Sequence, residues 1–245
     1  MPAQEVETPA IDRTQPSGRW EFDGEVAAVF DNMLARSIPQ YEAMREATFE
    51  LGRHYVQPGT AVVDLGCSRG EALAPFIRHF GINNRYIGIV ASSPMAAICR
   101  ERFDTLIRSS VVDIRETDLR RGYPEAPASL TLCILTAQFI PIEHRQRLIL
   151  SAFRNTVAGG ALIIVEKILG ATARLDEQLV SRYYDLKRRN GYTQEDIDRK
   201  RLSLEGVLVP LTARWNEELL RAAGWGEIDC FWRYYNFAGW IAIRE

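Results

Sequence analysis

The residues of this 245-residue chain that are best suited to hold a ligand lie in the run 64–70, which reads Asp-Leu-Gly-Cys-Ser-Arg-Gly. The β-branched run 61–65 leads into it and is typical of a buried strand. A glycine at the end of such a strand lets the backbone approach a ligand closely, and the next helix N-terminus supplies free N–H donors. The glycine spacing is not the Gly-x-Gly-x-x-Gly of a dinucleotide loop. The run therefore favours a small-molecule site of another kind.

The pattern around this run predicts a parallel, doubly wound α/β sheet, because strands and helices alternate at short spacing. Short apolar runs predict strands at 61–65, 85–90, 110–114, 130–135 and 161–165. Apolar residues at helical spacing predict helices at 25–36, 40–55, 71–80, 95–103, 142–155 and 215–224. The runs 227–232 and 237–243 predict a terminal antiparallel strand pair. Ligands of such sheets bind beyond the carboxyl ends of the strands.

The predicted domain organisation is simple. Residues 1–18 are rich in Pro, Thr, Gln and Glu, and we expect a flexible N-terminal arm there. Residues 19–245 are expected to form a single domain. Two long charged helices, at 175–191 and 193–208, are expected to form a helical insertion at about 172–210.

Composition and charge exclude several classes of protein. The net charge of −2 gives no strong field toward nucleic acid or a membrane, and the basic runs at 187–189 and 199–201 are interleaved with acids, as on a solvated helix face. No Cys-x-x-Cys pair or metal-ligand spacing of histidines is present, so we expect no metal. The four cysteines are expected to be reduced core residues of a cytoplasmic protein.

The run 64–70 resembles motif I of class I S-adenosylmethionine-dependent methyltransferases, usually Asp/Glu-x-Gly-x-Gly-x-Gly, with Ser68 at the middle glycine. This resemblance implies a Rossmann-like, mostly parallel sheet with an antiparallel terminal strand, and S-adenosylmethionine as the cofactor. It also implies that Asp118 meets the adenine amino group, with Leu119 beside the ring. The second strand of that fold normally ends in an acid that accepts both ribose hydroxyls, but here it ends in Val90, followed by Ala91.

The chain is more closely similar, over about residues 20–243, to the carboxy-S-adenosyl-L-methionine synthase family. The similarity is carried by Ser68 and by short segments at 22–23, 29–30, 36–41, 56–60, 64–68, 138–139, 159–162, 166–167, 186–192 and 200–201. The resemblance implies a homodimer that converts S-adenosylmethionine and prephenate to carboxy-S-adenosylmethionine. A separate enzyme uses this product to modify tRNA, so we expect no direct nucleic-acid binding.

The resemblance also implies the ligand residues. Besides Asp64 of motif I, they are Tyr41, Gly66, Cys67, Ser68, Asp118, Leu119 and Arg201. Arg201 is expected to bind the extra carboxylate, because a guanidinium meets a carboxylate with two parallel hydrogen bonds; with Tyr41 it is our candidate catalytic residue. Taken alone, Arg201 is better explained as a surface helix charge, and Tyr41 is explained equally well as a core tyrosine. For Asp118 the alternative is a helix or loop cap.

Two ligand positions depart from the family, which has an acid where this chain has Val90 and an asparagine where it has Ile134. Three functions stay open as a result. The chain is a carboxy-S-adenosylmethionine synthase with another group, such as Ser92 or Ser93, on the ribose; or it is a methyltransferase of a small-molecule pathway; or it is a non-catalytic nucleoside-binding relative. For the methyltransferase, the acceptor pocket would be lined by Glu166 and the tail aromatics Trp232, Tyr234, Tyr235 and Phe237.

Overall fold

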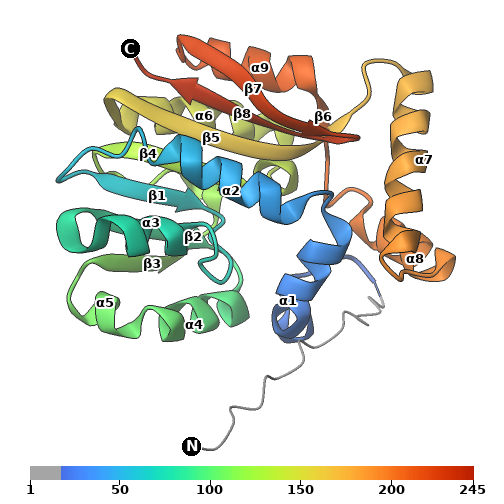
Figure 1. Cartoon of the computed structure of the whole chain (residues 1–245), viewed down its shortest axis with the longest axis horizontal. Coiled ribbons are helices and arrows are strands. Elements are labelled where there is room, and N and C mark those ends of the chain that lie inside the picture. Colours follow the sequence, from blue (N-terminus) through green and yellow to red (C-terminus); the bar gives the residue numbers. More distant parts are fainter. Residues whose placement is uncertain (1–17) are drawn as a thin grey trace, which may run out of the picture.

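A twisted sheet with helices on both faces forms the body of the protein, and a further group of helices stands at one end of it (Figure 1). The computed structural model describes residues 18–245. The predicted N-terminal arm, residues 1–18, lies outside the described residues except for Gly18.

The sheet has the strand order β3-β2-β1-β4-β5-β8-β7, and β6 pairs with β5 off this path. Strands β1 to β5 pair in parallel, whereas β8 is antiparallel to both β5 and β7. The strands are β1 (Ala61–Leu65), β2 (Arg85–Val90), β3 (Val112–Glu116), β4 (Ala128–Ile134), β5 (Thr156–Leu169), β6 (Leu211–Thr212), β7 (Glu227–Tyr234) and β8 (Phe237–Ile243). The predicted class I methyltransferase sheet, mostly parallel with an antiparallel end, is confirmed.

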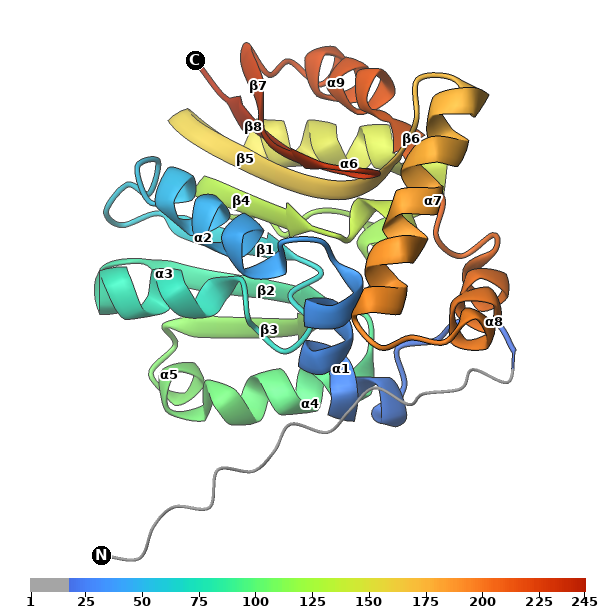
Figure 2. The same cartoon turned by 45° about the vertical axis from the view of Figure 1, so that its right-hand side comes forward.

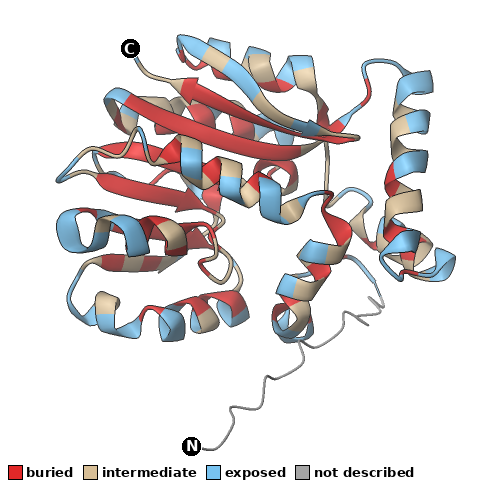
Figure 3. Ribbon diagram, viewed as in Figure 1, coloured by how far each residue is buried: buried red, intermediate tan, exposed pale blue. Residues whose placement is uncertain are grey.

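Two apolar layers cover the faces of this sheet, as Figure 3 shows by the buried strands. Every residue of β1 is buried, and alternate side chains enter different layers. Val62 packs in a cluster with residues of α3 and α4, while Val63 packs in a second cluster with residues of α6 and α9. The flanking helices are α2 (Tyr41–Gly52), α3 (Leu73–Phe80), α4 (Ser93–Arg102), α5 (Asp104–Arg108), α6 (Ile142–Asn155) and α9 (Ala213–Ala222). Short 3-10 turns occur at η1 (Gly81–Asn83), η2 (Leu119–Arg121) and η3 (Ala137–Phe139).

Three helices lie beyond the carboxyl ends of the parallel strands: α1 (Gly24–Ser37), α7 (Ala173–Arg189) and α8 (Gln194–Leu204) (Figure 2). Local capping sets where they begin: the Asp23 carboxylate accepts from the Val26 N–H, and Thr193 forms a capping box with Asp196 at α8. Arg36 Nε donates to the Asn190 carbonyl at 2.8 Å, which ties α1 to the α7–α8 connection. The helical insertion is thereby held over the strand ends.

Some sequence-based predictions were wrong in detail. The third strand begins at Val112 rather than Ser110, because Ser110 has a φ of 59° in the preceding turn. Lys187 is buried against the rings of Tyr183 and Tyr192 instead of lying on a solvated helix face.

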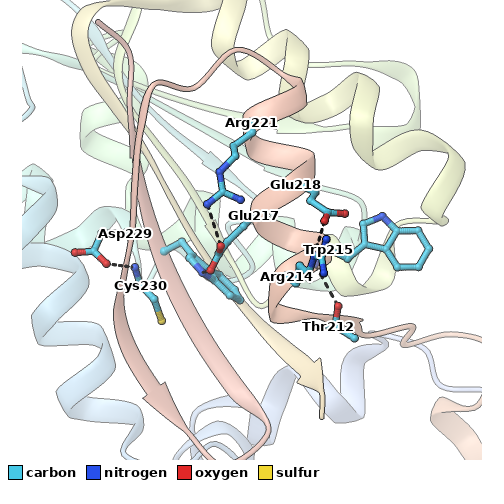
Figure 4. A network of polar contacts seen from close by, with 9 residues as sticks. Thr212, Arg214, Trp215, Glu217, Glu218, Arg221, Asp229 and Cys230 are labelled. Carbon is cyan, nitrogen blue, oxygen red and sulfur yellow. Dashed lines mark hydrogen bonds and ion pairs between the residues drawn. The ribbon is translucent and has the colours of Figure 1, made fainter. Parts of the chain in front are cut away.

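The prediction of a core position also fails for Cys230, which is exposed, while Cys67, Cys99 and Cys133 are buried. The reason is that β7 is the last strand of the sheet and pairs only with β8. Figure 4 shows this edge: Asp229 Oδ1 accepts from the Cys230 N–H, and α9 nearby carries the ion pairs of Arg221 with Glu217 and of Arg214 with Glu218.

The connection after β4 is fixed by a buried carboxylate, that of Glu166 on β5. Its Oε1 accepts from the Ala137 N–H at 2.9 Å and its Oε2 from the Gln138 N–H at 2.7 Å. In return, Gln138 Oε1 accepts from the Lys167 N–H at 2.7 Å. Burial raises the pKa of Glu166 to about 8, and the two backbone donors oppose that rise. These hydrogen bonds hold the connection after β4 against the carboxyl-terminal part of β5.

We expect the substitution E166Q to destabilise the protein by about 1–3 kcal/mol, because an amide has only one oxygen and would leave one buried N–H facing an NH₂ group. Urea unfolding monitored by circular dichroism measures this loss. The control is E177Q, at an exposed position on α7. Equal urea midpoints for the two variants would contradict the proposed role of Glu166 in holding the connection after β4.

Candidate functional site

A cavity of about 1270 Å³ opens between the strand ends and the end helices α1, α7 and α8. Its wall contains every residue predicted from the sequence to bind the ligand: Tyr41, Asp64, Gly66, Cys67, Ser68, Val90, Ala91, Asp118, Leu119, Ile134 and Arg201. These residues lie at the carboxyl ends of four strands, β1 to β4, or just after them, and on the helices α2 and α8. The fold thus brings together positions up to 160 residues apart, as from Tyr41 to Arg201. That they contact a ligand stays a prediction.

The run 64–70 forms the floor of the cavity as a sharp turn. The N–H groups of Gly66 and Cys67 both donate to the Ile89 carbonyl, at 2.9 and 2.8 Å. Gly66 has a φ of +86°, and a Cβ there would lie 2.2 Å from Thr136 Oγ1. Glycine is therefore required at this position for both conformation and space. Ser68 adopts a φ of 48°, the left-handed region that a glycine would take at no steric cost.

A polar end of the cavity forms where α2 passes the motif loop. Asp64 is 1% exposed, and its Oδ2 has no hydrogen-bond partner among residues 18–245. Burial raises the pKa of Asp64 to about 7, against the opposing charge of Arg45. Tyr41 and Arg45 are one helical turn apart on α2, and the Arg45 guanidinium lies 5.9 Å from the Tyr41 ring centroid. Burial likewise raises the pKa of Tyr41 to about 12.

The middle of the cavity is apolar. Val90, Ala91, Ile134 and Leu119 line it, together with Phe139, whose ring centroid lies 5.1 Å from that of Phe22. No carboxylate stands at the end of β2, where the strand closes with Val90. This wall suits a flat heterocycle better than the two hydroxyls of a ribose.

The predicted polar alternatives near Val90 are already engaged. Ser92 Oγ donates to the Phe22 carbonyl at 2.5 Å and caps α4 by accepting from the Met95 N–H. The Ser93 hydroxyl is bonded to Glu116, and Ser93 is not among the lining residues. Asp118 lines the cavity but also caps η2 and pairs with Arg120, which lowers the pKa of Asp118. Asp118 is therefore a helix cap, which was the alternative to a ligand contact that the sequence allowed.

Cationic side chains line the cavity at β5 and α8. Arg201 is half exposed, and its Nε lies 4.0 Å from Asp198 Oδ1. Lys167, the residue after Glu166 on β5, places its ammonium 4.9 Å from the Tyr183 ring centroid. Burial lowers the pKa of Lys167 to about 8, and Asp176 opposes that shift. Tyr183 stacks edge-on against Phe237 with centroids 5.4 Å apart, so an aromatic wall adjoins the cations.

Sequence reasoning missed several residues of the wall and misplaced others. Arg45, Glu71, Lys167 and Tyr183 all line the cavity. Lys167 stood in a segment matched to the family, and its position after a parallel strand was a signal that could have identified it. Glu166, expected in an acceptor pocket, is instead buried against backbone N–H groups. Of the tail aromatics Trp232, Tyr234, Tyr235 and Phe237, only Phe237 lines the cavity, because β7 lies at the far edge of the sheet.

Within residues 18–245 no group of three or more His, Cys, Asp or Glu side chains could hold a metal ion. In the same part of the chain, no helix combines the length and the apolar character needed to span a membrane.

Solved structures with a similar fold include methyltransferases. Human N-acetylserotonin methyltransferase in complex with SAM aligns with 90% of this chain and 56% of its own, at a TM-score of 0.60 and 14% identity. The protein PigF with SAH aligns with 91% of this chain and 60% of its own, at a TM-score of 0.59 and 15% identity. The chain thus spans little more than half of each, and at such identities the likeness concerns the fold alone.

Sequence relatives are closer. The Methyltransferase domain family matches residues 62–160. A carboxy-S-adenosyl-L-methionine synthase of Methylococcus capsulatus is 36% identical over 224 residues, which cover 91% of this chain and 93% of the relative. One of Wolinella succinogenes is 39% identical over 229 residues, covering 92% of this chain and 94% of the relative. The chain therefore belongs to the carboxy-S-adenosyl-L-methionine synthase family.

Proposed function

We propose that this chain binds S-adenosylmethionine and, with prephenate as the second substrate, converts it to carboxy-S-adenosylmethionine. The observation that carries the proposal is that the family's ligand positions, from Tyr41 to Arg201, line one cavity. Family membership supports the same reaction.

The residues in the cavity wall fit the amino-acid tail of S-adenosylmethionine and its adenine ring. The unpartnered Oδ2 of Asp64 suits the ligand's ammonium group. The Gly66 turn leaves room for close approach of a ligand to the backbone. The apolar wall around Leu119 and Ile134 suits the adenine ring. The volume of about 1270 Å³ exceeds the usual 300–1000 Å³ of a single ligand pocket, which leaves space for a second substrate.

The sulfonium of S-adenosylmethionine acidifies the adjacent methyl group, and prephenate supplies carbon dioxide together with hydroxide as its ring becomes aromatic. The hydroxide can take the methyl proton and leave as water, while a carbon–carbon bond forms to the carbon dioxide. The chain's part is to bind and orient. In this proposal Arg201 holds the new carboxylate, and Lys167 holds the carboxylate of the incoming acid. Their positions in the cavity wall, with Lys167 beside Tyr183 and Phe237, support these roles.

Val90 and Ile134 favour a second candidate, methyl transfer to a small acceptor. At these two positions the family resemblance implies an acid and an asparagine that contact the nucleoside, and this chain has apolar side chains instead. Losing charged hydrogen bonds to the ribose costs roughly 1.5–3 kcal/mol, or tenfold or more in affinity. A non-catalytic relative is the third candidate.

The family resemblance also supports a cytoplasmic homodimer that acts on small molecules and not directly on nucleic acid.

Incubation with S-adenosylmethionine and prephenate, followed by mass spectrometry, tests the reaction. We expect a product heavier by one carboxyl group. R201M should lower its formation roughly 10- to 100-fold, because the carboxylate loses a bidentate partner. The control is R199M on the same helix, whose side chain pairs with Glu195 and is not among the lining residues. No mass gain, together with methylation of an added acceptor and release of S-adenosylhomocysteine, would favour methyl transfer. A failure to bind S-adenosylmethionine at millimolar concentration would rule out both enzymatic candidates.

Restoring a carboxylate at the end of β2 should tighten nucleoside binding. V90D is expected to lower the Kd for S-adenosylmethionine roughly tenfold and also to lower the melting temperature of the free protein, because Val90 is 5% exposed. Calorimetry and thermal unfolding measure the two effects. V90N, which lacks the charge, is the matched control. Weaker binding by both variants would mean that the ribose does not lie at this strand end.

The pH dependence of catalysis should report Lys167, whose pKa is lowered to about 8 by burial. Since the ammonium loses its charge above that pH, kcat/KM for prephenate is expected to fall above about pH 8. In K167R the guanidinium stays charged, so the fall should move to higher pH. The affinity for S-adenosylmethionine alone, measured at each pH, should be the same in K167R as in the wild type. Identical pH profiles of the two proteins would exclude Lys167 from binding the acid.

A further inference from the structure

Two opposite charges stand near each other at the polar end of the cavity without forming an ion pair. The Asp64 carboxylate is buried and its Oδ2 lacks a partner among the described residues. The Arg45 guanidinium lines the same cavity and lies 5.9 Å from the centroid of the Tyr41 ring. Charges held this way in a sheltered site are unfavourable until a bound group meets them.

The other cations near the motif loop are already engaged. Arg69 pairs with Asp31 at 3.4 Å and donates to the Ala27 carbonyl. Arg102 pairs with Glu71 at 3.1 Å and donates to the Arg69 carbonyl. Neither Arg69 nor Arg102 is among the lining residues, whereas Arg45 is, and Arg201 lines the cavity from α8. Of the three arginines near the motif loop, Arg45 is therefore the one that a ligand in the cavity can reach.

The geometry of α2 aims Arg45 at the ligand. Tyr41 and Arg45 are four residues apart and so share one helix face, and both line the cavity. Met44 and Thr48, on the adjoining face, are buried toward the protein and hold the helix in place. The Arg45 charge acts on Asp64, although the two side chains form no ion pair. A group that carries a positive and a negative charge one carbon apart would fill the space between them.

We propose that Arg45 binds the α-carboxylate of the amino-acid tail of S-adenosylmethionine, with Asp64 receiving the tail's ammonium. The inference rests on the cofactor of the proposed function but not on the carboxylation reaction. It gives the two arginines separate tasks: Arg45 binds the carboxylate that the ligand brings, and Arg201 binds the one that the reaction adds. Arg45 then determines specificity, since it separates ligands with an intact amino-acid tail from nucleosides without one.

Calorimetric titration with three ligands tests this assignment. S-adenosylmethionine has both charges of the tail, decarboxylated S-adenosylmethionine has only the ammonium, and 5′-methylthioadenosine has neither. We expect R45M to weaken S-adenosylmethionine roughly 10- to 100-fold and to leave the other two ligands within about threefold of wild type. R45K should lose less, because it keeps the charge without the bidentate fork. D64N should weaken both charged-tail ligands and spare methylthioadenosine.

The control variant is R53M, which lies just beyond α2, pairs with Glu50 and is not among the lining residues. It should bind all three ligands as the wild type does. If R45M weakens methylthioadenosine as much as S-adenosylmethionine, Arg45 is merely structural and the inference fails. It fails too if wild type does not distinguish S-adenosylmethionine from its decarboxylated form. Wild type that shows the expected binding but no carboxylated product would remove the proposed reaction and leave this inference standing.

Discussion

The close approach of the Gly66 backbone to Thr136 is the constraint on which the site depends. At that point the connection leaving β1 passes the connection leaving β4, and a single added Cβ would lie 2.2 Å from Thr136 Oγ1. The Glu166 carboxylate holds the β4 connection from the other side through the Ala137 and Gln138 N–H groups. A tight turn and a buried carboxylate together define the cavity floor, so substrate recognition rests on backbone that cannot shift freely.

The cavity wall combines charged side chains with an apolar stretch. Asp64, Arg45, Lys167 and Arg201 supply the charges, while Val90, Leu119 and Ile134 are apolar. In the proposed binding mode, the amino-acid tail of the nucleoside sulfonium lies at Asp64 and Arg45. The aromatic wall of Tyr183 and Phe237 beside Lys167 then suits a cyclic acid as the second substrate.

Val90 and Ile134 show how a family member can keep its fold and change the polarity of its nucleoside site. Both side chains belong to the apolar packing of the strand ends or contact it, so the substitutions are compatible with folding. Their consequence concerns affinity, because neither side chain accepts a hydrogen bond and Ser92 is committed to Phe22 and to the α4 cap. In the proposed binding mode, the charged groups Asp64, Arg45 and Arg201 therefore carry more of the binding.

The sequence by itself determined the fold class, the positions of nearly all helices and strands and the ligand-binding character of the run 64–70, since short-range patterns encode βα turns directly. The family resemblance added Tyr41, Asp118, Leu119 and Arg201. Only the tertiary structure decided which distant side chains meet. Arg45 has no local signal on an amphipathic helix, and the local sequence of Lys167 does not show that its ammonium lies beside the Tyr183 ring. Glu166 was misassigned for the same reason: whether a strand-end acid faces a cavity or backbone N–H groups depends on how neighbouring connections pack.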